Sequence, residues 1–388
     1  MRIDADWLID QPTQKILRLL DRAGHQALVV GGCVRNALLG VPVTDIDIAT
    51  SARPETVIEL AESNGLKAIP TGLAHGTITI VVDKVPFEIT TFRRDVETDG
   101  RRAVVAYTNA LHEDARRRDF TMNAIYANAD GVVVDPLGGL PDLNARRVRF
   151  IEDANLRIRE DYLRSLRFFR FHAQYGDPDA GLDTEALAAI ASNLEGLETL
   201  PGERVGAEMR KLLAVSNPAP ALAAMESTGA LTSLLPGAST TFIAPLVHLE
   251  ALANQPPDTV RRLVVLGGED AEERLRLSRA EEKNRRTLLQ TINSNTNPAE
   301  IAWRFGVEIA WSAVLARQAI AGLPLDDATG VAIDAGAIAD FPVSAKDLMP
   351  DLSGAEIGET LKKLERAWID SDFALTHREL LEMLRNEG

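Results

Sequence analysis

The chain has 388 residues, of which 45% are hydrophobic, and its 42 Lys and Arg against 57 Asp and Glu give a net charge of −15. This charge excludes binding to nucleic acid over the whole surface, so any RNA contact needs a local basic patch. A single cysteine excludes a disulfide framework and a cysteine-based zinc site. The acidic first residues lack the pattern of a signal peptide, and no apolar run is long enough to span a membrane. We therefore expect a cytoplasmic protein without a membrane contact.

Short β-type runs alternate with helical stretches in the first part of the chain. The runs 77–82 and 85–90, which flank Asp83–Lys84, predict a hairpin. The polar, glycine-containing segment 95–102 is expected to be a mobile loop. From residue 144 onward, helical periodicity replaces the β pattern. The sequence thus predicts a small α/β head followed by a long, acidic, all-helical arm.

The glycine pair Gly31–Gly32 follows the apolar run 27–30 and precedes a helical stretch. Because glycine has no side chain, backbone N–H groups at such a turn can come close to an anion, and the start of a helix adds a favourable dipole. Arg35 adds a fixed positive charge. These features predict a cradle for a triphosphate. The rival interpretations are a dinucleotide-binding turn, although its G-x-G-x-x-G spacing is absent, and a turn with no ligand.

Two aspartates, Asp45 and Asp47, are expected on one strand, where they share a face while Ile46 and Ile48 enter the core. Neighbouring like charges are costly unless a cation lies between them, and Mg²⁺ is the natural occupant when phosphates supply further oxygens. Two such ions activate an attacking hydroxyl and stabilise the leaving oxygen in phosphoryl transfer. A solvated strand edge is the alternative interpretation.

Glu88 is the candidate for a third carboxylate. Its neighbours Phe87 and Ile89 are expected to face inward, which leaves Glu88 on the opposite face of its strand. The alternative is an ion pair with Arg93 or Arg94.

Residues 146–170 contain eight arginines and four acidic residues, which makes them the one credible basic patch in this acidic chain. Asp161 and Arg164 lie three residues apart and are expected on a single helix face. Because a carboxylate only accepts hydrogen bonds and a guanidinium only donates them, this pair would accept cytosine and adenine and reject uracil and guanine. An intrahelical ion pair without a ligand is the alternative.

A second arginine cluster precedes this helix. Arg118 is placed to reach a triphosphate, and Asp119 and Asn123 to hold a ribose. Alternatively, Asp119 caps a helix that begins near Phe120.

Four motifs in order resemble class II tRNA nucleotidyltransferases, the bacterial CCA-adding enzyme and poly(A) polymerase group of the polymerase β superfamily. They are G-G-x-V-R-x-x-L-L-G with D-x-D (31–47), R-R-D-F-T-x-N-A (117–124), D-P-x-G-G-x-x-D-L (135–143) and E-D-x-L-R-x-L-R-x-x-R-F (160–171). The resemblance implies an α+β fold that begins with a polymerase-β-like nucleotidyltransferase head of mixed β-sheet and helices. The implied domains are this head (1–143), an all-α neck that recognises the base (144–215), and an all-α body and tail that bind tRNA (216–388).

The resemblance also implies roles for single residues. Asp45 and Asp47 would bind catalytic Mg²⁺, and Glu88 occupies the family's third acidic position. Asn36 departs from the family, which often has Asp there, and receives no role. The residues implied to bind the nucleotide are Gly32, Arg35, Arg118, Asp161, Arg164, Arg167 and Arg170.

The implied activity is the template-independent addition of CCA to the 3′ end of tRNA from CTP and ATP, with release of pyrophosphate, by a monomer or homodimer. A poly(A) polymerase or a partial CC- or A-adding enzyme is the alternative. Residues 351–388 carry more acidic than basic side chains, which argues against a basic extension of the kind expected in a poly(A) polymerase. An inactive RNA- or nucleotide-binding module is a remote alternative, because all three candidate carboxylates are present.

Overall fold

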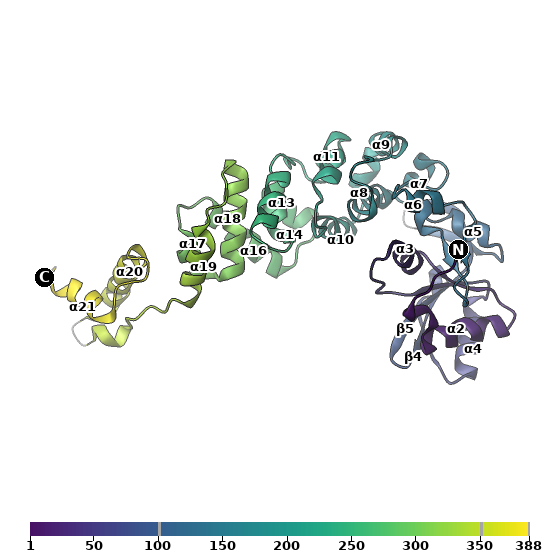
Figure 1. The fold of residues 1–388 in the computed structure, drawn as a ribbon, viewed down its shortest axis with the longest axis horizontal. Coiled ribbons are helices and arrows are strands. Elements are labelled where there is room, and N and C mark those ends of the chain that lie inside the picture. The colour runs from purple at the N-terminus through teal and green to yellow at the C-terminus, as the bar shows by residue number, and fades with distance from the viewer. Residues whose placement is uncertain (100–101, 350–351, 387–388) are drawn as a thin grey trace. The chain divides into compact units, whose positions relative to one another are not determined.

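The computed structural model describes residues 1–99, 102–349 and 352–386 (Figure 1). The chain divides into two compact units, Met1–Pro236 and Gly237–Gly388, which are described separately. None of the described helices is long and apolar enough to cross a membrane.

The first unit begins with a seven-stranded mixed sheet whose strand order is β3-β4-β5-β2-β1-β8-β9. β2 runs parallel to β5, and the other neighbouring strands of this sheet are antiparallel. This sheet confirms the prediction of a mixed head. The strands are β1 (Ala27–Val30), β2 (Asp47–Thr50), β3 (Lys67–Gly72), β4 (Thr77–Val82), β5 (Val85–Thr91), β8 (Tyr126–Ala127) and β9 (Val133–Val134).

The predicted hairpin joins β4 and β5 through Asp83 and Lys84, whose φ angles of 48° and 71° suit a tight two-residue turn. The segment expected as a loop is instead largely strand. Its described residues belong to β6 (Arg93–Asp99) and β7 (Arg102–Tyr107), which form a separate antiparallel pair, while residues 100–101 lie outside the described part. Pairing between strands satisfies the backbone N–H and C=O groups whatever the side chains are. The polar composition of this segment was therefore not sufficient to predict a loop.

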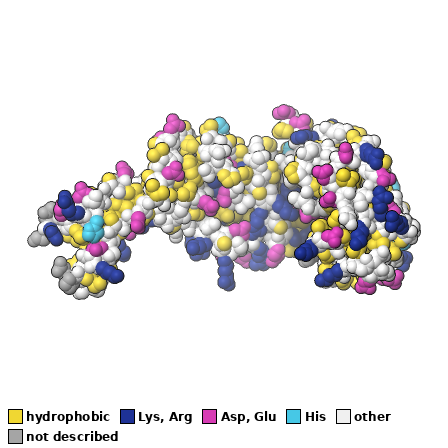
Figure 2. All heavy atoms as spheres, turned by 60° about the horizontal axis from the view of Figure 1, so that its bottom comes forward, with side chains coloured by type: hydrophobic (Ala, Val, Ile, Leu, Met, Phe, Trp, Pro, Cys, Tyr) yellow, Lys and Arg dark blue, Asp and Glu magenta, His cyan; other side chains and the backbone are white. Residues whose placement is uncertain are grey.

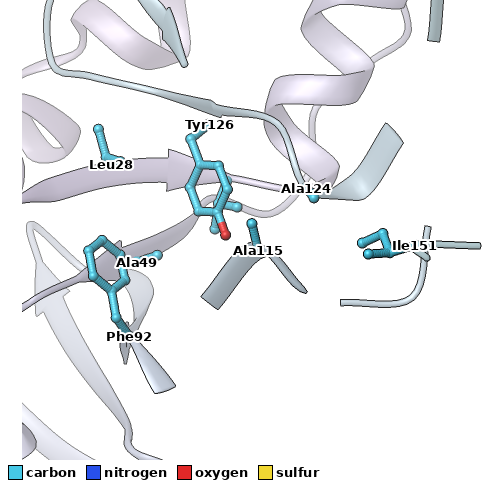
Figure 3. Close-up of a cluster of buried hydrophobic side chains, with 8 residues drawn as sticks. Leu28, Ala49, Phe92, Ala115, Ala124, Tyr126 and Ile151 are labelled. Carbon is cyan, nitrogen blue, oxygen red and sulfur yellow. The ribbon is translucent and has the colours of Figure 1, made fainter. Parts of the chain in front are cut away.

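Helices flank the sheet, and the apolar core lies between these layers. One buried cluster joins Leu28 of β1, Ala49 of β2 and Ala115 of α5, and Figure 3 shows Tyr126 in the middle of it. The helices of the head are α1 (Asp6–Ile9), α2 (Gln11–Arg22), α3 (Gly32–Leu39), α4 (Pro54–Ser63), α5 (Leu111–Arg116) and α6 (Leu140–Asn144).

The rest of the first unit is helical, and its central element is α8 (Leu163–Tyr175), which packs against α10 and α11. Aromatic rings connect α8 to the head, since the ring centre of Phe120 lies 5.0 Å from those of Phe150 and Phe171. Burial of these rings fixes α8 next to the segment that carries Arg118. The other helices are α7 (Ala154–Glu160), α9 (Thr184–Ala191), α10 (Gly202–Leu213), α11 (Ala219–Ser227) and α12 (Ala230–Leu234).

The described part of the second unit contains helices and no strand. One apolar cluster surrounds Ile301 and Ile333, and another surrounds Trp368. The buried carboxylate of Glu250 accepts hydrogen bonds from Arg261 (2.8 Å) and Arg262 (2.6 Å). The helices are α13 (Ile243–Leu252), α14 (Thr259–Leu266), α15 (Ala271–Arg274), α16 (Arg279–Ile292), α17 (Pro298–Phe305), α18 (Val307–Ala321), α19 (Ala328–Ile338), α20 (Ala355–Asp370) and α21 (His377–Asn386).

Candidate active site

The glycine turn connects β1 to α3 as the sequence predicts. Gly31 has a φ of 73°, a left-handed conformation that favours glycine, and Gly32 is the first residue of α3. A side chain on Gly31 would begin 3.5 Å from Nη1 of Arg118. The turn therefore presents the start of a helix next to a guanidinium, an arrangement suited to an anion.

Two carboxylates meet on neighbouring parallel strands beside this turn. Asp47 of β2 lies in register with Glu88 of β5, and both are exposed. The residues that flank Glu88, Phe87 and Ile89, are buried, as expected. Because paired residues in a sheet share a face, the two carboxylates lie on the same side.

Asp45 differs from its predicted placement. β2 begins at Asp47, so exposed Asp45 lies in the chain just before the strand rather than on it. Ile46 is half-buried, and the prediction that it enters the core is wrong, whereas Ile48 is fully buried. The strand is short because the residues before Asp47 do not pair with β1 or β5.

The charges around Asp47 are crowded. Although the Asp47 side chain reaches solvent, the protein groups around it desolvate its carboxyl and raise its pKa above the ordinary value, the negative charges of Glu88 and Asp45 raise it further, and Arg118 opposes them. Among the described residues, no three His, Cys, Asp or Glu side chains lie close enough together to hold a metal ion by themselves. The arrangement attracts a cation but offers an incomplete set of ligands, which oxygens of a bound phosphate would complete.

Arg118 is fixed by a buried network that the sequence analysis missed. Its Nη2 donates to Asp114 (3.2 Å) and its Nε to the hydroxyl of Tyr126 (3.1 Å), which itself donates to Asp114 (2.8 Å). Burial would raise the pKa of Asp114, but the charges of Arg118 and Arg117 outweigh it and lower the pKa below its ordinary value. Asp114 lies on α5, which ends at Arg116, and the four-residue spacing to Arg118 just beyond the helix was the available signal.

Arg35 lies behind the glycine turn and is 5% exposed. Its Nη1 donates to Asn123 (2.5 Å), its Nη2 donates to Tyr175 (2.8 Å), and its guanidinium carbon lies 3.9 Å from the centre of the Tyr175 ring. The side chain thus links α3 to α8. Asn36 accepts from Arg35 and donates to the carbonyl oxygen of Pro42 (2.8 Å).

Asp119 binds protein groups rather than facing open space. One carboxylate oxygen accepts from the backbone N–H of Phe120 (2.9 Å) and from Asn123 (2.8 Å), and the other accepts from Arg167 (2.7 Å). Burial would raise the pKa of Asp119, but the charge of Arg167 and these hydrogen bonds lower it to about 2. Asp119 and Asn123 are each 7% exposed and are bound by protein groups, and the hypothesis that they hold a ribose stays a prediction.

Asp161 and Arg164 do not form the predicted pair. Asp161 lies in an extended conformation between α7 and α8, and its two oxygens accept from Arg204 of α10 (3.1 and 2.7 Å). Arg164 instead donates to Glu160 (2.5 Å) and to the backbone carbonyl oxygen of Arg117 (2.9 Å). The two residues share no regular helix face because α8 begins only at Leu163. The alternative of an intrahelical ion pair between them is also wrong.

The arginines of α8 do not form an open basic patch, whereas Arg146, Arg147, Arg149 and Arg159, earlier in the arginine-rich segment, are exposed. Arg170 is 8% exposed and donates to Glu208 of α10 (2.5 Å), while Arg167 is bound to Asp119. Each cation of α8 thus has a carboxylate partner from another element or from the preceding helix. Sequence reasoning missed Arg204 and Glu208 because they lie 38 to 43 residues from their partners and no local pattern connects them.

Comparisons with known proteins agree with this arrangement. Residues 27–149 match the poly A polymerase head domain family, and residues 181–241 match a family described as the probable RNA and SrmB-binding site of polymerase A. The chain is 32% identical to human CCA tRNA nucleotidyltransferase 1, mitochondrial, over 97% of this chain and 91% of that protein. It is 42% identical to the CCA-adding enzyme of Geobacillus thermodenitrificans over 57% of this chain and 54% of that enzyme. The crystal structure of the Bacillus stearothermophilus CCA-adding enzyme in complex with CTP superposes with a TM-score of 0.73 at 29% identity, covering 97% of this chain and 98% of that one.

Proposed function

Because the chain belongs to the CCA-adding tRNA nucleotidyltransferase family, we propose that it adds C, C and A to the 3′ end of tRNA from CTP and ATP, without a nucleic-acid template. The single observation that carries this proposal is the register of Asp47 with Glu88 beside the Gly31–Gly32 turn and Arg118. Nucleotidyl transfer needs positioned phosphates and negative oxygens that attract a cation, and these residues supply both.

The glycine turn and Arg118 would bind the triphosphate. The backbone N–H groups at the start of α3 point toward an anion, and Arg118 lies beside them in a fixed position because Asp114 and Tyr126 hold it. Gly32 contributes its backbone, and Arg35 contributes its positive charge from behind the turn and aligns α3 with α8. The 3′-hydroxyl of the RNA then attacks the α-phosphorus opposite the departing pyrophosphate.

Asp45 and Asp47 would hold divalent cations, of which Mg²⁺ fits best, with Glu88 as the third carboxylate nearby. The fit rests on oxygen-only donors and on the crowding of Asp47, whose pKa is raised by desolvation and by the charges of Glu88 and Asp45. Such ions lower the pKa of the attacking hydroxyl and neutralise charge on the leaving oxygen. Asp47 and Glu88, which share one face of the sheet, would orient the attacking hydroxyl and the α-phosphate there.

The incoming base would be selected at the start of α8. A bound base would meet acceptors from Asp161 and donors from Arg164, with contributions from Arg167 and Arg170. It would share Asp161 with Arg204 and draw Arg164 from its contacts with Glu160 and the backbone carbonyl oxygen of Arg117. Cytosine and adenine both place an amino donor next to a ring-nitrogen acceptor, which suits this order, whereas uracil and guanine place a carbonyl against Asp161. Arg204 fixes the Asp161 carboxylate by two hydrogen bonds.

The remaining parts of the proposed function concern the substrate, the oligomeric state, the domains and the location of the enzyme. It acts on the acceptor end of tRNA as a monomer or homodimer, with the neck over 144–215 and the tRNA-binding body and tail over 216–388. The cytoplasm is proposed as its location because a chain with a single cysteine, which cannot form a disulfide within itself, fits a reducing compartment. That cysteine, Cys33, is buried. Burial raises the pKa of its thiol to about 11, which leaves it unreactive.

The test is incubation of the purified protein with a tRNA transcript that lacks CCA, together with CTP, ATP and Mg²⁺. We expect two C residues and then one A, identified by mass spectrometry of the RNA. A long A tail would favour a poly(A) polymerase, one or two added residues a partial enzyme, and no addition a binding module. Asp45→Ala and Asp47→Ala should abolish addition while CTP binding survives, and the exposed Asp179→Asn serves as the control.

A further inference from the structure

The segment that matches an RNA-binding family does not supply the positive charge that RNA needs. Residues 181–241 contain three basic and seven acidic residues. One of the three, Arg204, is bound to Asp161. Because phosphate contacts supply much of the affinity for RNA, cations outside residues 181–241 must contribute to it.

The second unit concentrates cations in one place. Residues 274–286 contain six basic and two acidic residues, whereas the rest of the unit, 237–273 with 287–388, contains ten basic and 22 acidic residues. Figure 2 shows that Lys and Arg side chains gather in places along the helical part of the chain rather than evenly. We call the exposed cations of this segment the α16 patch, which consists of Arg274, Arg276, Arg279, Lys283 and Arg286.

The geometry of α16 aligns three of these cations. Arg279, Lys283 and Arg286 follow the spacing i, i+4, i+7, so they lie along one face of the helix over about 10 Å. The opposite side of α16 is anchored in the core by Leu288, which is 2% exposed. The patch is thus presented by a packed helix.

Two of the nearby acidic groups are occupied. Glu281 forms a capping box with Ser278, accepting from its backbone N–H (2.7 Å), and Glu272 is bound to Arg285. Glu269, Asp270 and Glu273, which precede the patch, are exposed, whereas Glu281 and Glu282, the two acidic residues of α16, are half-buried. Arg279, Lys283 and Arg286 therefore dominate the potential along their face of α16.

We propose that the α16 patch binds the sugar-phosphate backbone of the tRNA substrate without reading its sequence. This inference rests on the proposed function, since it names a second surface for the same substrate. RNA fits better than an acidic protein because the segment exposes no large apolar or aromatic side chain, the kind that anchors protein interfaces. Leu275 is buried and Leu277 half-buried.

The test compares two double variants with equal loss of charge. Lys283→Gln with Arg286→Gln removes two patch cations, and Lys346→Gln with Lys362→Gln removes two exposed cations of η4 (Ala345–Leu348) and α20 in the same unit. Binding of full-length protein to a tRNA transcript without CCA is measured over a range of salt concentrations. For the patch variant, we expect the Kd at low salt to rise about tenfold or more and the slope of log Kd against log salt to fall by about 1 to 2. The control variant should match the wild type.

The results of this experiment can support or overturn the α16 patch independently of the proposed function. If the wild type adds CCA and the patch variant needs more tRNA for the same rate, with unchanged CTP binding, both proposals stand. Equal Kd and salt slope in the patch variant and the wild type, while the wild type adds CCA, would overturn the α16 patch alone, as would an equal loss in the control variant. A wild type that binds tRNA through the patch but adds no nucleotide would overturn the proposed function alone.

Discussion

The contacts of Asp119 provide a quantitative test of how much the packing of the head against α8 is stabilised by one ionised carboxylate. Its carboxylate joins Arg167, Asn123 and the backbone of Phe120, and its pKa lies at about 2 instead of 3.8. At about 1.36 kcal/mol per pKa unit, this difference corresponds to about 2 kcal/mol of stability supplied by the ionised form. Asp119→Asn should remove that contribution and leave the Arg167 charge without its partner.

The measurement is amide hydrogen exchange of peptides from residues 163–175. At pH 7 the Asp119→Asn variant should exchange about 30-fold faster than the wild type in this segment, which is about 2 kcal/mol expressed as a ratio. A carboxyl with a lowered pKa stabilises the fold above its unfolded value and loses this effect as the pH falls through its folded value. The two proteins, compared at matched pH, should therefore converge as the pH falls from about 4 to 2. Equal exchange at pH 7, or a difference that persists at pH 2, would refute the reasoning, and Asp179→Asn is the matched control.

Three further substitutions have defined outcomes. Asp47→Asn removes one of the crowded charges, so the free energy of unfolding of the metal-free protein in urea should rise by about 0.5 kcal/mol. Nucleotide addition by this variant should fall at least about a hundredfold. A lower free energy of unfolding would contradict the electrostatic account. Asp114→Asn should raise the KM for CTP about tenfold or more, because Arg118 loses its buried partner. An unchanged KM would show that Arg118 does not contact the nucleotide. Arg204→Gln should increase incorporation of U and G relative to C and A, since Asp161 loses both hydrogen bonds, and an unchanged base ratio would remove Arg204 from base selection.

Local chemistry made part of the fold predictable from the sequence. The glycine turn was predictable because a left-handed φ at Gly31 favours a residue without a side chain, and the hairpin at Asp83–Lys84 because β-branched runs flank a two-residue turn. The orientation of the Glu88 side chain, opposite to its buried neighbours, followed from the two-residue period of a strand. Each of these features depends on residues within a few positions of one another.

Features set by tertiary contacts were not predictable in the same way. The partner of Asp161 is Arg204, 43 residues away, and nothing in the local spacing distinguishes it from Arg164. The burial of Arg35 depends on Tyr175 of another helix. Arg167 and Arg170 were counted in an open patch because their carboxylate partners, Asp119 and Glu208, lie far away in the sequence. Charge counts along a sequence do not show which ions are paired across the fold.

The central claim is that Asp45 and Asp47, beside the glycine turn and Arg118, hold divalent cations against the triphosphate of the incoming nucleotide. The most direct measurement is anomalous diffraction from crystals grown with Mn²⁺ and a non-hydrolysable CTP analogue. We predict Mn²⁺ density between the Asp45 and Asp47 carboxylates and the phosphates, with the triphosphate at the Gly31–Gly32 turn. Mn²⁺ bound elsewhere, or a triphosphate that lies away from these two carboxylates, would contradict the account.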